Sequence, residues 1–303
     1  MDNAQIKRSI QALHFLKTLF VFLVTIVLLN PLSSVSAANL KNGKYIFQVA
    51  GCGSCHTDPG KNGKDGRPKG DPLAGGRPLE TPFGTFYSPN ITTNKKFGIG
   101  SWNFEDFRRS MVQGKGPNTA PYYPAFPYTS YTGMSEKNLR DLWAYLTVQP
   151  SYDRKNDRHK LHFPFNMRGL LYIWRALFFD EGSTGYFEST QSAEWNRGAY
   201  LIRVLAHCGE CHTRRNSMGA MDWNHELAGN PSGPGGKIPD LTARNRNGIV
   251  NWSANDVIEY LSSGMTPEGD FAGGEMAEVI DHSTAKMTAA DRKAVVIFLK
   301  SLD

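Results

Sequence analysis

The feature that most constrains this chain is a five-residue pattern, Cys-x-x-Cys-His, which occurs twice in the 303 residues and uses all four cysteines. The two copies are Cys52-Gly53-Ser54-Cys55-His56 and Cys208-Gly209-Glu210-Cys211-His212. The pattern is typical of covalent haem attachment, in which two thiols form thioether bonds with the porphyrin and the adjacent histidine ligates the iron. We therefore expect two haem c groups, one at each motif, attached through Cys52, Cys55, Cys208 and Cys211 and ligated by His56 and His212.

Other uses of four cysteines fit less well. An exported chain would ordinarily pair them as two disulfides, but that leaves the two adjacent histidines without a role. A zinc site would need the four thiols to converge on one metal. A thioredoxin-like dithiol would need a βαβ context, which the sequence does not indicate.

The first 37 residues are predicted to be a secretory signal peptide. Lys7, Arg8 and Lys17 precede an apolar run over residues 19–29, and Val35-Ser36-Ala37 resembles a cleavage site. The alternative is an uncleaved anchor, but the run is shorter than the about 20 residues that a membrane span needs. We expect the mature protein in the periplasm, free or associated with the inner membrane, with membrane contact that is at most peripheral.

The net charge indicates which partners the chain can have. It is +6 for the whole sequence and about +4 without residues 1–37, which carry three basic residues and one acid. This modest excess suits an acidic protein surface. Nucleic acid is not expected, because Lys and Arg do not cluster with interleaved aromatic residues. The lysines between Lys61 and Lys69 lie among Gly, Asp and Pro and predict a solvated loop.

The chain also repeats itself around the two motifs, which predicts two similar domains. Matching pairs are Gly43-Lys44-Tyr45 with Gly198-Ala199-Tyr200, Leu73-Ala74-Gly75 with Leu227-Ala228-Gly229, and Pro89-Asn90-Ile91-Thr92 with Pro239-Asp240-Leu241-Thr242. The distance from the proline to the next tryptophan, Trp102 or Trp252, is 13 residues in both copies.

Helices dominate the predicted structure, and strand signals are nearly absent. Each copy contains an amphipathic helix that ends near a glycine, over residues 104–114 and 254–264. Each copy closes with another helix, for which Ser135 and Thr288 are natural N-caps, and Asp291 completes a pattern that resembles a capping box. The long Gly- and Pro-rich loops would need a large apolar group to pack against, and a buried porphyrin supplies it.

The predicted order is therefore a signal peptide at 1–37, a first haem domain at 39–150, a linker at 151–189 and a second haem domain at 190–303. The linker has a polar part and then apolar residues at helical spacing from Leu170 to Phe178. We expect this helix to pack between the domains, because an apolar stripe is usually core. The alternative is a helix that docks a partner or lies on a membrane surface.

The second axial ligand of the second haem is predicted to be Met276. It lies in a loop before the final helix, and methionine sulfur at this position raises the haem potential. Met265 and Met287 are alternatives, although Met287 precedes an N-cap, where an apolar residue more often forms a hydrophobic staple.

The first domain lacks a clear counterpart of Met276. The corresponding stretch, residues 123–128, contains no methionine, and Met134 aligns with Met287. Met134 is the tentative ligand, with core packing as its alternative, and Met111 lies earlier on a helix. Otherwise the first haem has a water, an open site or an unusual ligand. His162 and His225 are further alternatives for a distal ligand.

The chain resembles two-haem cytochrome c proteins related to the cytochrome c subunits of membrane-bound alcohol, gluconate and sugar dehydrogenases. The matching stretches are Gly76-Arg77-Pro78-Leu79, Thr81-Pro82-Phe83-Gly84-Thr85, Ser88-Pro89-Asn90-Ile91-Thr92, Tyr123 to Tyr131, Phe163-Pro164-Phe165-Asn166 and Glu194 to Tyr200. The resemblance implies an all-α fold of two tandem class I-type cytochrome c domains joined by a helical linker. It also implies Gly274-Glu275-Met276 as a distal loop. Many members have Pro-Ala-Met-Pro where this chain has Pro124-Ala125-Phe126-Pro127.

Two functions from different classes follow. The first is an electron carrier that takes electrons from a periplasmic or membrane dehydrogenase and passes them toward a quinone-linked or oxidase acceptor in the respiratory chain. The second is a two-haem oxidoreductase that acts on a small substrate at an open first haem. Phe126 motivates this alternative, because many members of the family have methionine at this position. The carrier is favoured, because no acid–base constellation surrounds the first motif in the sequence.

Overall fold

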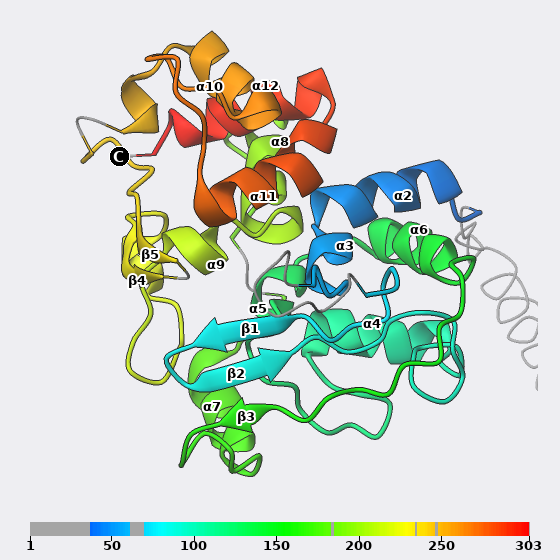
Figure 1. Cartoon of the computed structure of the whole chain (residues 1–303). Helices are drawn as coiled ribbons and strands as arrows, with labels where there is room; N and C mark the ends of the chain where they lie inside the picture. The colour runs from blue at the N-terminus through cyan, green and yellow to red at the C-terminus, as the bar shows by residue number, and fades with distance from the viewer. Residues whose placement is uncertain (1–36, 61–69, 183–184, 234, 246–247, 303) are drawn as a thin grey trace, which may run out of the picture. The chain divides into compact units, whose positions relative to one another are not determined.

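The computed structural model describes residues 37–60, 70–182, 185–233, 235–245 and 248–302 (Figure 1). All the elements below belong to the compact unit formed by residues 38–303. The predicted signal peptide, up to residue 36, and the predicted lysine loop at 61–69 lie outside the described residues. Among the residues described, none of the helices has the length and apolarity to cross a membrane.

The first half is built on two crossed helices, α2 (Leu40–Val49) and α6 (Glu136–Leu146), drawn in blue and green in Figure 1. Asn39 and Ser135 cap them, each through a side-chain oxygen that accepts a backbone N–H three residues on. The helices cross at Gly43, where a Cβ atom would lie 2.0 Å from the Asp141 carbonyl oxygen. Between them come α3 (Cys52–Cys55), α4 (Phe104–Gln113) and α5 (Tyr128–Tyr131).

The second half repeats this plan. Helix α8 (Ala193–Tyr200), which continues as a π-helical turn at Leu201–Leu205, crosses α12 (Ala289–Leu299). A Cβ atom at Gly198 would lie 2.1 Å from the Ala294 carbonyl oxygen, so this crossing is as close as the first. The remaining helices are α9 (Gly209–His212), α10 (Ala254–Ser263) and α11 (Gly274–His282). Three short 3-10 turns lie at Trp223–His225, Ile249–Asn251 and Thr284–Lys286.

Most predicted helices are confirmed, but two predictions are wrong. Strands do occur: β1 (Pro78–Thr81) pairs antiparallel with β2 (Gly84–Tyr87), which pairs with β3 (Lys160–Leu161). A second ladder joins β4 (Asn230–Gly233) and β5 (Gly236–Ile238). These strands have four residues or fewer, too short for the alternation of side chains to be recognised.

The second wrong prediction is the capping box of the final helix. Thr288 does cap α12 by accepting the Asp291 N–H. The Asp291 carboxylate does not return to the Thr288 backbone; it binds Arg197, and the Thr288 N–H is donated to the Tyr45 hydroxyl at 3.3 Å. The charged guanidinium of Arg197 forms stronger hydrogen bonds with the Asp291 carboxylate than a neutral backbone N–H would.

One continuous hydrophobic core joins the two halves. It contains Ile46, Val49, Leu139 and Leu142 from the first half, and Leu201, Leu205, Val257 and Phe298 from the second. The linker helix α7 (Leu170–Phe178) buries Leu171 and Trp174, as expected for a packed helix. Its other face is exposed, so the packing interpretation holds for one side of the helix only.

Candidate haem-binding sites

Each Cys-x-x-Cys-His motif forms a single helical turn that follows a residue in the left-handed region. This residue is Gly51 (φ 62°) before α3 and His207 (φ 42°) before α9. The turn places the two cysteines of each motif on one short element, and all four cysteines are free rather than paired as disulfides. The two thiols of each motif therefore face one site together.

Both motif histidines are oriented by the same contact. His56 Nδ1 donates to the Pro89 carbonyl oxygen at 2.8 Å, and His212 Nδ1 donates to the Pro239 carbonyl oxygen at 2.9 Å. A carbonyl can only accept, so Nδ1 carries the proton and Nε2 keeps its lone pair. A metal-ligating histidine typically has its second nitrogen fixed in this way. The repeated Pro-Asn/Asp-x-Thr segment thus aims each imidazole.

Burial keeps these groups neutral. It raises the pKa of the Cys52 and Cys208 thiols to about 12 and that of Cys211 to about 11. It also lowers the pKa of His56 and of His212 below the ordinary value of 6.5. Each motif thus offers two thiols that can form thioethers and one neutral imidazole whose lone pair can ligate iron. The residues present therefore fit haem c at both motifs.

The loops around the two motifs repeat at the level of single hydrogen bonds. The Leu73 N–H is donated to the Thr57 hydroxyl at 3.1 Å, and the Leu227 N–H to the Thr213 hydroxyl at 3.0 Å. Both leucines have positive φ, 63° and 57°, which is rare for a branched side chain. In the same way, the N–H groups of Gly75 and Gly229 bond the carbonyls of His56 and His212. The internal repeat read from the sequence is thus a structural repeat.

The distal position differs between the halves. Two equivalent backbone hydrogen bonds align the halves here. After α10, the Ala272 N–H donates to the Gly264 carbonyl at 2.8 Å, and after α4, the Tyr122 N–H donates to the Gly114 carbonyl at 2.8 Å. Met276 follows Ala272 by four residues, and Phe126 follows Tyr122 by four residues. Met276 and Phe126 therefore occupy matching positions in the two halves. Met276 lies in the first turn of α11, half-buried against the core. The phenylalanine ring at the matching position offers iron no lone pair.

The other methionine candidates have distinct surroundings. Met134 and Met287 are both buried, 6% and 4% exposed, directly before the N-caps of α6 and α12. Met111 is buried on α4, and Met265 is 40% exposed. Met134 therefore occupies the core position that matches Met287.

The two histidines considered as distal ligands lie at the surface or in polar contacts. His162 is exposed. His225 is bonded to Asp222 at 2.9 Å and to Arg214 at 2.7 Å.

Sequence reasoning missed a set of contacts that ties the motifs to each other's distal segments. Arg77 forms a two-pronged ion pair with Glu278 of α11, two residues after Met276, and also donates to the Ser54 carbonyl at 3.1 Å. In the other direction, the Glu210 carboxylate accepts the hydroxyls of Thr129 and Ser130, both at 2.9 Å. Each attachment turn is therefore held against the distal segment of the other half.

Only a weak sequence signal pointed to these residues. Glu210 is the one charged residue inside either motif, at the position where the first motif has Ser54. Tyr131 donates to the Ala50 carbonyl at 3.3 Å and its ring centroid lies 5.5 Å from that of His207, so the segments that lead into the two turns lie close together.

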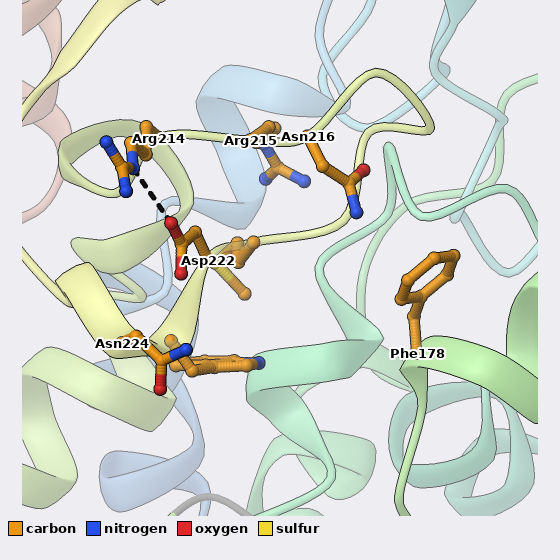
Figure 2. Close-up of a pocket in the computed structure, with 8 residues that line it drawn as sticks. Phe178, Arg214, Arg215, Asn216, Asp222 and Asn224 are labelled. Carbon is orange, nitrogen blue, oxygen red and sulfur yellow. Dashed lines mark hydrogen bonds and ion pairs between the residues drawn. The ribbon is translucent and has the colours of Figure 1, made fainter.

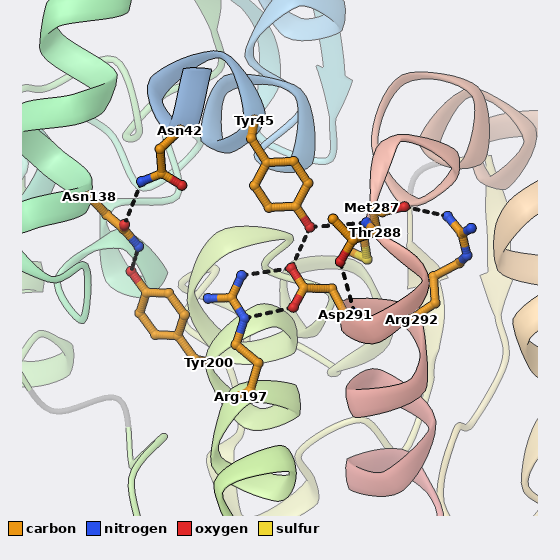
Figure 3. Close-up of polar contacts among 9 residues, drawn as sticks. All are labelled: Asn42, Tyr45, Asn138, Arg197, Tyr200, Met287, Thr288, Asp291 and Arg292. Carbon is orange, nitrogen blue, oxygen red and sulfur yellow. Dashed lines mark hydrogen bonds and ion pairs between the residues drawn. The ribbon is translucent and has the colours of Figure 1, made fainter. Parts of the chain in front are cut away.

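A second set of reciprocal contacts joins the halves at the helix N-termini (Figure 3). The Tyr45 hydroxyl donates to Asp291, which also forms an ion pair with Arg197. Tyr200, the counterpart of Tyr45, accepts the Asn138 side-chain amide at 2.7 Å and the Ser135 N–H at 3.3 Å. Each tyrosine thus contacts the start of the closing helix of the other half.

A cavity of about 460 Å³ lies where the end of α7 meets the loop after the second motif (Figure 2). Its lining residues are Phe178, Arg214, Arg215, Asn216, Met221, Asp222, Trp223 and Asn224. The charged groups already have partners: Arg214 binds Asp222 at 2.8 Å, and Arg215 forms an ion pair with Glu210. The cavity therefore offers no charged group that awaits a ligand.

Comparisons with known proteins agree with this geometry. The cytochrome c family pattern matches residues 40–148. A diheme cytochrome c-type protein of Cereibacter sphaeroides is 42% identical over 259 residues, which cover 85% of this chain and 84% of that protein.

Two longer relatives are subunits of dehydrogenases. The fructose dehydrogenase cytochrome subunit of Gluconobacter japonicus is 37% identical, over 89% of this chain and 54% of that protein. The gluconate 2-dehydrogenase cytochrome c subunit of Pantoea cypripedii is 33% identical, over 88% and 60%. The chain thus spans little more than half of these two proteins. It belongs to the family of two-haem cytochromes c that is related to the cytochrome c subunits of dehydrogenases, and it carries two haem c groups.

Proposed function

We propose that this protein is an exported electron carrier that accepts electrons from a dehydrogenase and passes them toward the respiratory chain. The observation that carries the proposal is the placement of two attachment turns, each with its own oriented histidine, close together in one continuous core. Related proteins that are named as dehydrogenase subunits support a dehydrogenase as donor. The acceptor would be quinone-linked or an oxidase.

The residues would divide the work as follows. Cys52 and Cys55 would attach the first haem and Cys208 and Cys211 the second, with His56 and His212 as proximal ligands. Met276 would be the distal ligand in the second half, and Met134 is the candidate in the first. When bound, the haems supply one-electron chemistry by cycling between Fe(III) and Fe(II). The chain excludes water, fixes the imidazoles and sets the two potentials.

The unlike distal positions would give the electron a direction. Methionine sulfur stabilises the reduced iron and raises the potential, so the site with Met276 is expected to have the higher potential. A spectroelectrochemical titration of the purified protein tests this. Equal potentials, or a lower potential for the site in the second half, would contradict the assignment.

The residue assignments are tested by mass. Expression with the cytochrome c maturation machinery should give a protein whose mass includes two haems, and a pyridine haemochrome assay should give the same number. Peptide mapping should find the haems on peptides that contain residues 52–56 and 208–212. Cystine or zinc at these sites would overturn the assignment.

Export and domain order belong to the same proposal. The basic start, apolar run and small-residue site predict cleavage after Ala37 and a periplasmic product. N-terminal sequencing of the protein from a periplasmic fraction tests this. We also propose that 39–150 and 190–303 are tandem class I-type domains joined by 151–189, supported by the repeated hydrogen bonds around both motifs.

Phe126 supports one alternative function. An aromatic ring at the distal position would leave the first iron open to a small ligand, and the protein could then act as an oxidoreductase at that site. A spectrum of the oxidised protein separates the two functions. A high-spin component that binds cyanide favours the enzyme, and two low-spin haems exclude it.

A further inference from the structure

The linker helix α7 presents an unusual outer face. Met167 lies just before α7, and on the helix Leu170, Ile173 and Leu177 follow one another at spacings of three or four residues and form a single stripe. The four side chains are 50%, 40%, 56% and 63% exposed. Tyr172, on the same helix, and Phe163, four residues before Met167, are 61% and 78% exposed. The other large apolar residues exposed in the described chain are scattered along the sequence, so these six form its main concentration.

The inner face of α7 is held firmly, so the stripe is not a helix waiting to fold inward. Leu171 and Trp174 are each 6% exposed, and the Trp174 indole N–H is donated to the Met218 carbonyl at 2.9 Å. Arg175, the one charged residue of α7, bonds the Gln113 carbonyl at 2.5 Å and stacks on Tyr128. The Arg175 guanidinium therefore points toward the rest of the protein, and the outer stripe of α7 contains no charged side chain.

Positive charge precedes the stripe. Residues 154–178 contain six Lys or Arg residues and one acid, Asp157, which is paired with Arg154. Arg158 and Lys160 are exposed in the segment that leads to the helix, whereas Arg168 donates to the Pro121 carbonyl at 2.6 Å. Two acids, Asp180 and Glu181, follow α7, and Glu181 is drawn to the Gln113 side chain at 3.0 Å.

We propose that this face, the stripe with its basic approach, seats the protein on an anionic phospholipid bilayer. An uncharged stripe with aromatic neighbours fits the boundary between headgroups and acyl chains, and a basic flank is attracted to anionic headgroups. The helix lies on the bilayer and does not span it, because nine residues are too few.

The test is binding of the full mature holoprotein to vesicles of phosphatidylcholine with and without phosphatidylglycerol, measured by co-sedimentation. The wild type should bind the phosphatidylglycerol vesicles and be released by salt. The double variant Ile173→Ser/Leu177→Ser should bind at least about tenfold more weakly, since both side chains would leave the acyl boundary. Val148→Ser is the matched control, because Val148 is 63% exposed outside this face, and it should bind as the wild type does.

A second variant separates the charge from the stripe. Arg158→Gln/Lys160→Gln should lose about fivefold per residue on anionic vesicles and flatten the salt dependence, while binding to neutral vesicles stays unchanged. All variants should keep the wild-type haem spectrum, since the changed residues are exposed. Equal binding by the wild type and the Ile173→Ser/Leu177→Ser variant overturns the proposal. So does a wild type that fails to bind vesicles but forms dimers, or binds a dehydrogenase, through the same residues.

Discussion

The two halves of the molecule share a backbone and differ in charge. Both cross their first and last helices at a glycine, and both send a tyrosine to the closing helix of the other half. At the helix starts, however, the second half has an ion pair, Arg197 with Asp291, where the first has the amides of Asn42 and Asn138, 3.3 Å apart. The candidate distal positions also differ, with Met276 in the second half and Phe126 at the matching position of the first. The repeat therefore fixes geometry, while single side chains set the chemistry of each site.

The largest expected effect comes from removing the thiols of one half. Cys52→Ala/Cys55→Ala should give a protein with only the second haem, and Cys208→Ala/Cys211→Ala one with only the first. Each loss removes a large apolar group from the core, so the melting temperature should fall by many degrees in both variants. Mass spectrometry and thermal melts check this. Retention of both haems by either variant would refute the assignment.

Exchanging the distal residues should narrow or invert the difference between the sites. Phe126→Met offers the first iron a thioether and should raise its potential, whereas Met276→Phe should lower that of the second. We expect shifts of roughly 100 mV, within the about 0.8 V that axial ligands can span. Redox titration of the single and double variants measures this. A double variant with unchanged potentials would show that these positions do not face iron.

Breaking the Arg77–Glu278 contact should affect the second site more than the first. Arg77→Gln should destabilise the protein by about 1–3 kcal/mol and weaken methionine coordination in the second half, because Glu278 lies two residues after Met276. Arg203→Gln is the control, since Arg203 is equally buried and pairs with Glu226 at 2.7 Å rather than with a residue of α11. Denaturant melts and the methionine–iron absorption band report the two effects. Matching band changes in both variants would leave Arg77 with only a structural role.

Acid should weaken the ion pair at the start of the final helix. Burial disfavours ionisation of Asp291, but hydrogen bonds from Arg197 and Tyr45 outweigh it and hold the Asp291 pKa below 3.8. The stability from this carboxylate is therefore present above about pH 4 and is lost as pH falls through the lowered pKa. Asp291→Asn should be less stable than the wild type at neutral pH, and the gap should close as pH falls through the lowered pKa of Asp291. A gap between Asp291→Asn and the wild type that stays the same at every pH would contradict the ion-pair argument.

The smallest effect distinguishes a packed methionine from a ligand. Met134→Leu and Met287→Leu keep the volume of a buried side chain, so each should cost less than about 1.5 kcal/mol. If Met134 only packs in the core and does not ligate iron, Met134→Leu should keep the wild-type haem spectrum, as Met287→Leu should. A spectral change confined to Met134→Leu would assign it as the first distal ligand.

The sequence predicted what depends on neighbours along the chain. The attachment turns, the N-caps at Ser135 and Thr288 and the helix ends at Gly114 and Gly264 are all local patterns. The misses depend on distant partners. Arg77 and Glu278 are 201 residues apart and Tyr45 and Asp291 are 246 apart, so no local spacing could pair them. The strands were missed because their pairing, rather than their side-chain pattern, defines them.

The shared core has a consequence for how the molecule gains and loses its structure. Because apolar residues of both halves belong to one cluster, neither half can open without exposing the inner surface of the other. The melt should then be cooperative, with a single calorimetric peak whose enthalpy belongs to the whole assembly. If either half were expressed alone, apolar residues that are buried in the shared core would be exposed to solvent, and the fragment would tend to aggregate. Attachment of one haem during maturation would therefore order part of the shared core and favour attachment of the other.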